Sequence, residues 1–252
     1  MRREVRAKIG VIGARLAGME ILLLRTALAP SLVLLVSVVA RRSGPRRSGL
    51  LLGAPTTSGP FLALMWLNGG SQAAARAAHG NVAAQLIVAA FCLVYGRLAP
   101  VLRPARTLTA ALVCAAGAGL LAAMCANVWL TAALGLAVIF AGLRTWPAPA
   151  PASGHTDRQP DHARRWDIPV RMAVSATTVL LAVHAADALG SFAGGILAAL
   201  PVLLAVMALS THRSTGAATA AAMMRAALTA TPCTLGFLLM IYTALAASVT
   251  RS

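Results

Sequence analysis

The chain has 252 residues, of which 59% are hydrophobic and only 11% are charged. A soluble domain carries about 25% charged and 45–50% apolar residues, so an ordinary soluble domain is excluded. The formal charge is +16, but the arginines stand in short clusters between long uncharged runs, and aromatic residues make up only 4%. A nucleic-acid partner is therefore excluded, because both a basic stripe and a stacking platform for bases are missing. We predict a polytopic protein whose partner is the lipid bilayer.

Two uncharged tracts are long enough for two crossings each, since one crossing needs about 20 apolar residues. The tract 107–143 contains Asn127 near its middle, and the tract 172–212 is interrupted by Asp187 and Gly190. Each tract is predicted to be a helical hairpin that turns at those residues. The result is an all-α polytopic membrane helix bundle of about eight transmembrane helices. Further spans are expected at 19–40, 48–68, 83–99 and 228–248.

The basic residues predict an orientation. Fourteen of them fall in the loops between spans 1–2, 3–4, 5–6 and 7–8, and eight fall on the other side. The positive-inside rule puts those loops in the cytoplasm and both termini outside. Residues 1–18 form a basic N-terminal segment without a signal-peptide pattern, and either Met1 or Met19 is the true start. Residues 146–167 are expected to form a cytoplasmic Pro/Ala-rich loop.

Two helices are expected to begin before their apolar parts. Ser71 and the pair Ser214-Thr215 are predicted helix N-caps, because short hydroxyl side chains satisfy free amides there. Alanine-rich stretches follow them at 73–78 and 217–222. Solvated helix ends are the favoured interpretation of these stretches, and a tilt into the membrane is the alternative.

An internal repeat relates the two halves of the chain. Pro60 and Pro201 are 141 residues apart, and each is followed by a similar segment ending in methionine. The arginines Arg76 and Arg225 that follow are 149 residues apart, and aromatic pairs follow at separations of 146–147. Spans 1–3 then correspond to spans 6–8, and the odd difference of five makes the repeats inverted, an architecture typical of transporters. The predicted units are a first repeat at 19–106, a linker hairpin at 107–145 and a second repeat at 168–252.

Part of the second half resembles a known family. The run Ala193-Gly194-Gly195-Ile196-Leu197 continues through Leu200-Pro201 to Thr211-His212-Arg213 and a span ending near Tyr242. It is similar to the GlpM family of small bacterial inner-membrane proteins, and the run from Gly53 to Pro60 resembles the first half of longer, duplicated proteins of that kind. Members are about half this length, so the resemblance implies a duplicated or fused form. It implies a membrane fold in the bacterial cytoplasmic membrane and no particular activity.

The densest candidate site lies in the second span. Pro55 and Pro60 are five residues apart and break helical hydrogen bonds there. The amides freed by the break and the hydroxyls between the two prolines are suited to a small polar or anionic ligand. The alternative is a kink whose hydroxyls bond their own carbonyls.

His184 and Asp187 lie on one helical face and form a candidate proton or ion-coupling pair, or a simple interfacial pair. Asn68, His79, Asn81 and Gln85 are candidate gate lining near the outer end of spans 2 and 3. The candidate substrate-binding residues are Thr56, Thr57, Ser58, Gly59, Pro60, Arg76, Gly195, Pro201 and Arg225.

Enzyme chemistry finds little support in the sequence. The four cysteines form no C-x-x-C pair, no metal site or cofactor is predicted, and six acidic residues leave few candidates for acid–base work. We therefore predict a secondary transporter or permease rather than an enzyme. The alternative is a non-transporting accessory or assembly component of an envelope pathway. The sequence leaves the solute, the coupling ion and a homo-oligomeric state open.

Overall fold

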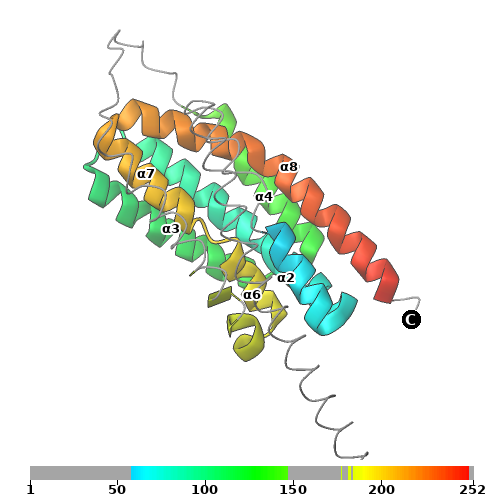
Figure 1. Cartoon of the computed structure of the whole chain (residues 1–252). Helices are drawn as coiled ribbons and strands as arrows, with labels where there is room; N and C mark the ends of the chain where they lie inside the picture. The colour runs from blue at the N-terminus through cyan, green and yellow to red at the C-terminus, as the bar shows by residue number, and fades with distance from the viewer. Residues whose placement is uncertain (1–57, 147–176, 178–180, 183, 250–252) are drawn as a thin grey trace, which may run out of the picture.

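The computed structural model describes residues 58–146, 177, 181–182 and 184–249 (Figure 1). Within these residues every regular element is an α-helix, which confirms the all-α prediction for the described part. The predicted span 19–40, the first ten residues of the span 48–68 and all of the loop 146–167 except its first residue lie outside it. The helices are α2 (Ser58–Leu98), α3 (Pro104–Met124), α4 (Val128–Arg144), α6 (Ser191–Ala198), α7 (Val202–Ser214) and α8 (Ala217–Val249).

Three helical segments of the described part are long and apolar enough to cross a membrane, namely Gly69–Leu98, Pro104–Met124 and Ala217–Val249. A fourth, Val128–Arg144, is apolar but has only 17 residues. Large apolar side chains face outward, among them Val113, which is 71% exposed. These features suit an integral membrane protein, because lipid takes the place of water around such faces. They do not by themselves give the predicted number of eight spans.

Helix α2 is a helical hairpin with its apex at Gly70. Gly70 has φ 70° and ψ −168°, a conformation that only glycine adopts readily, and the helix reverses there. Ser58 lies twelve residues before the apex and Asn81 eleven residues after it, yet the Ser58 Oγ donates to Asn81 Oδ1 at 3.2 Å. Phe61 of the short arm is buried in one apolar cluster with Ala77 of the long arm. The long arm does begin at this break, but the predicted N-cap is wrong by one residue, because the residue with non-helical backbone is Gly70 and not Ser71.

The long arm of α2 is the central helix of the described structure. In its apolar window 78% of residues are buried, against 22% for α3 and 17% for α8. Helices α3, α4, α6 and α8 all pack against α2, as Figure 1 shows. The alanine-rich stretch 73–78 lies at these contacts, with Ala74 and Ala77 fully buried. The prediction of a solvated helix end is therefore wrong for this stretch. Its small alanine side chains let neighbouring helices come close to the α2 backbone and bury it.

The predicted turn at Asn127 is confirmed. Helix α3 ends at Met124 and α4 begins at Val128, and the Asn127 side chain caps α4 by accepting from the backbone N of Trp129 at 2.9 Å. The two helices each pack more extensively against α2 than against each other. Both helices of the linker hairpin therefore pack against the central helix.

The second half contains the predicted turn at Gly190 and a second break at Pro201. Gly190, with φ 93°, precedes α6, and Pro201 separates α6 from α7. A further glycine of positive φ, Gly216, separates α7 from α8. Ser214 and Thr215 end α7 instead of capping α8, and the Thr215 hydroxyl donates back to the Thr211 carbonyl at 2.9 Å. The N-cap prediction for this pair is wrong, because Gly216 already makes the turn between the helices.

Arginines gather at one end of the bundle, which we call the basic end. The end of α2 meets the other helices there, since Tyr95 lies 3.3 Å from the Nδ1 of His212 on α7 and Gly96 lies against Met224 on α8. Arg97 donates to the carbonyl of Gly142 at 3.5 Å and so joins α2 to the end of α4. The arginines of the basic end are Arg97, Arg103, Arg106, Arg144, Arg213 and Arg225.

Candidate functional site

Three polar side chains of α2 form a cluster inside the bundle, which we call the polar cluster: Ser58, Asn81 and Gln85. Ser58 comes from the start of the short arm and the other two from the long arm. Asn81 is fully buried, Ser58 is 3% exposed and Gln85 5% exposed. Gln85 lies one turn after Asn81, and its Nε2 donates to the Asn81 carbonyl at 3.4 Å. The hairpin at Gly70 thus brings together polar residues that are distant in the sequence.

Two buried nitrogen atoms of the long arm have no hydrogen-bond partner among the described residues. They are the Nδ2 of Asn81 and the Nε2 of His79, and both are buried. A buried amide nitrogen left unpaired costs about 1–3 kcal/mol, so native proteins seldom retain one without a reason. An amide nitrogen can only donate, so the missing partner of Asn81 must be an acceptor.

Helix α6 closes one side of the polar cluster. A Cβ atom added at Gly195 would overlap the carbonyl oxygen of Ala77 and lie 3.1 Å from the backbone nitrogen of Asn81. Gly80, on the α2 side of the crossing, meets the backbone of Phe192 in the same way. The two helices therefore touch backbone to backbone beside Asn81, which only glycines at the crossing allow.

Aromatic rings border the imidazole of His79. The ring centroid of Phe192 on α6 lies 5.0 Å from that of His79, and the ring of Tyr242 on α8 lies 6.3 Å away, both edge-on. These rings cover His79 without offering its Nε2 an acceptor. Since the long arm begins near Gly70 and rises 1.5 Å per residue, Asn81 lies about 16 Å along it.

Six of the nine predicted substrate-binding residues divide into three groups. Ser58 belongs to the polar cluster and Gly195 borders it, so the structure brings these two together. Gly59 and Pro60 lie in the first turn of α2, where proline does not interrupt helical hydrogen bonds. Thr56 and Thr57 lie outside the described residues.

The charged candidates lie elsewhere. Arg76 and Arg225 are both exposed, and the contact of Gly96 with Met224 places Arg225 at the basic end. Arg76 is twenty residues before Gly96 on one helix, so about 30 Å separates the levels of the two arginines. They do not meet in one site. His184 and Asp187 are also exposed, so the described structure gives this pair no buried environment.

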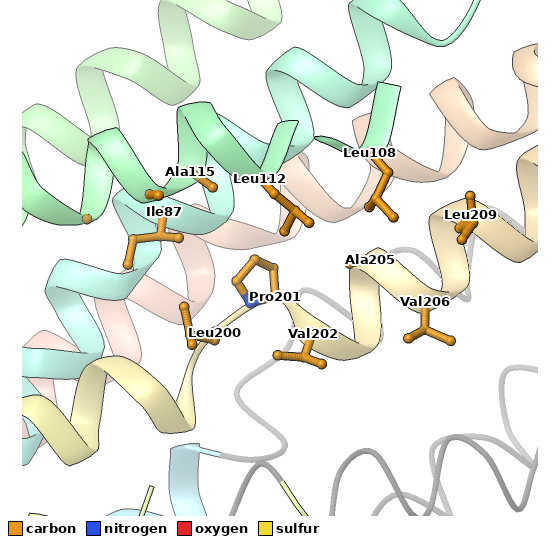
Figure 2. A pocket seen from close by; sticks show the side chains of 12 residues that line it. Ile87, Leu108, Leu112, Ala115, Leu200, Pro201, Val202, Ala205, Val206 and Leu209 are labelled. Atoms are coloured by element: carbon orange, nitrogen blue, oxygen red, sulfur yellow. The ribbon is translucent and has the colours of Figure 1, made fainter. Parts of the chain in front are cut away.

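Pro201 is buried and lines a cavity of about 350 Å³, shown in Figure 2. Its walls come from α2, α3, α7 and the break between α6 and α7, and every lining residue is apolar. This part of the predicted site therefore offers no hydrogen-bonding group to a polar solute.

The sequence predicts His79, Asn81 and Gln85 near the outer end of spans 2 and 3. The structure places all three within the membrane-length segment Gly69–Leu98, with Asn81 and Gln85 buried. The available signal was the spacing of Asn81 and Gln85, which puts two amides on one face of an apolar helix.

Comparison with family models, curated proteins and solved structures found no match. The resemblance to the GlpM family therefore stays a prediction. What the described geometry offers chemically is a buried amide donor beside a hydroxyl at the crossing of two interrupted helices. A buried donor of this kind is suited to a polar group that accepts a hydrogen bond.

Proposed function

We propose that this protein is a multi-pass transporter of the bacterial cytoplasmic membrane, and that its polar cluster binds a small polar or anionic solute. The observation that carries the proposal is the unpaired Asn81 Nδ2, buried in the most enclosed of the membrane-length helices. Polar groups are costly at such depth and commonly mark solute pathways. A carboxylate, phosphate or carbonyl oxygen of a solute would accept from this amide.

Interrupted helices support the same proposal. The cluster lies where the α2 hairpin crosses α6, and α6 is itself separated from α7 by Pro201. In transporters, interrupted helices at matching positions of two repeats surround the solute near the middle of the bilayer.

A second spacing supports the inverted repeat. Gly70 and Gly216, both with positive φ, are 146 residues apart, and so are Phe91 and Phe237. Each glycine opens a long helix, and the two long helices run antiparallel side by side, as inverted repeats require. At the same separation, Gln85 corresponds to Thr231, whose hydroxyl donates to the carbonyl of its own helix at 3.0 Å. The polar cluster therefore belongs to the first half alone.

Ligand-dependent thermal unfolding of the purified protein tests the proposal. A ligand that binds only the native state at about 100 times its Kd adds about 2.7 kcal/mol to the free energy of unfolding. We expect a member of a panel of carboxylates, phosphate, sulfate, amino acids and polyols to raise Tm and to enter proteoliposomes. Asn81→Leu should abolish both effects, whereas Gln72→Leu, at an exposed amide of the same arm, should retain both. A panel without any shift, or a shift that survives Asn81→Leu, contradicts the proposal.

An accessory role without transport is the second candidate. It is favoured by the apolar lining of the cavity at Pro201, which suits hydrocarbon rather than a polar solute. If the protein is an accessory component, Asn81→Leu should leave intact the activity of the envelope pathway that the protein serves. If the protein is a transporter, the same variant should lose that activity.

A further inference from the structure

The apolar cavity at Pro201 is a groove on the surface of the bundle. Leu112, on its α3 wall, is 45% exposed, and Ala116 on the same wall is exposed, so the space opens outward. Figure 2 shows Ile87 and Leu200 toward one end and Leu108 and Leu209 toward the other. The volume of about 350 Å³ thus extends along the space between α3 and α7.

The interruption of the helix at Pro201 explains why the groove exists. Helix α6 ends at Ala198, and α7 starts only at Val202. The intervening turn offers few side chains to α3, and Gly119 on α3 contributes none beside Ile87. Because close packing is the rule inside proteins, an apolar space of this size is expected to be filled by something in the membrane.

The end of the groove at Leu108 and Leu209 points to the basic end. Arg213 follows Leu209 by four residues, so it lies one turn further along the same face of α7. Arg213 is exposed, whereas Arg106, two residues before Leu108 on α3, lies on another face of that helix. Among the described residues Asp187 is the only acidic one, and it precedes α6 at the opposite end from α7's last turn. The positive charge at this end is therefore uncompensated by described carboxylates.

We propose that the groove binds one acyl chain of an anionic phospholipid whose phosphate lies beside Arg213. The apolar walls match hydrocarbon, and Arg213 at one end matches an anionic headgroup. Basic pockets between membrane helices recognise such headgroups, each nearby arginine contributing about a fivefold gain in affinity. The lipid site is separate from the polar cluster and does not depend on the transporter proposal.

The test measures lipid retained by the full-length protein. Nanodiscs of phosphatidylcholine with or without phosphatidylglycerol of identical acyl chains are the probes, and native mass spectrometry counts the bound lipids. We expect one tightly held phosphatidylglycerol. Arg213→Gln should weaken it about fivefold. Ala116→Trp, which fills the groove from its exposed side, should weaken it more than about tenfold, because each buried methylene contributes about fourfold.

Matched controls separate the site from general attraction to a basic surface. Arg225→Gln removes an exposed arginine of the same end on α8, and Ala133→Trp adds an indole at an exposed alanine of α4. Both should leave phosphatidylglycerol binding within about twofold of the parent protein. Val206→Trp, on the α7 wall, repeats the filling test if Ala116→Trp does not fold.

Three results would overturn the lipid site. The first is equal retention of phosphatidylcholine and phosphatidylglycerol, which removes the role of charge. The second is an equal loss in Arg225→Gln and Arg213→Gln, which makes the attraction diffuse. The third is full retention in both tryptophan variants, which leaves the groove without a lipid and favours a partner helix as its occupant.

Discussion

Replacing the hydrogen-bonded pair of the polar cluster by apolar side chains should make the protein more stable. In the double variant Ser58→Ala/Asn81→Leu, leucine keeps the branched shape of asparagine and the unpaired Nδ2 disappears. Removing that unpaired donor gains about 1–3 kcal/mol, and losing the 3.2 Å bond between the two side chains costs about 0.5–1.5 kcal/mol. We expect a net gain of roughly 1 kcal/mol, or about 2–4 °C in Tm for a chain of this size.

The single variant Ser58→Ala is the matched control. It removes the hydroxyl that donates to Asn81 Oδ1 and leaves the asparagine with a second unpaired atom. We therefore expect it to lower the free energy of unfolding by about 1–3 kcal/mol. The assay is thermal unfolding of purified protein in detergent, without solute. A double variant that melts several degrees below the parent would refute the reasoning, because the Asn81 side chain would then stabilise the fold instead of being kept for ligand binding.

Two further predictions test the packing and the orientation. Gly195→Ala should destabilise by about 1–3 kcal/mol in thermal unfolding, because its Cβ overlaps the carbonyl of Ala77, whereas Gly236→Ala, with no atom within 4 Å, should gain about 1 kcal/mol. Equal effects would argue against the close crossing of α2 and α6. With the basic end in the cytoplasm, a membrane-impermeant maleimide should label Ala126→Cys in intact cells and Thr145→Cys only after permeabilisation. The reverse labelling pattern would invert the orientation.

Local signals predicted the breaks of the chain well. Asn127 is a short polar residue within an apolar tract and caps the following helix, and Pro201 lacks the amide that would continue α6 into α7. The membrane character of the described helices also followed from composition, since uncharged apolar runs of this length are typical of membrane-spanning helices.

Long-range packing explains what the sequence did not show. The stretch 73–78 reads as a solvated helix because alanine has a high helix propensity and little hydrophobicity. Its burial depends on α6, whose Gly195 lies more than a hundred residues away. Likewise Ser58 and Asn81 join only because the chain reverses at Gly70. The candidate site named Ser58 and Gly195 but not the asparagine between them, since no local pattern links the three.

The enclosure of α2 has a consequence for how the protein is made. The central helix is synthesised before the helices that cover it, and α8, which shields much of its surface, is the last element described. Until α8 and α6 have been inserted, the amides of Asn81 and Gln85 face lipid or the insertion machinery. Unpaired polar groups are unfavourable in hydrocarbon, so the early intermediate is prone to be retained or degraded. Ribosomes stalled before residue 217 should therefore expose α2 to quality-control proteases, and completion of the chain should end that vulnerability.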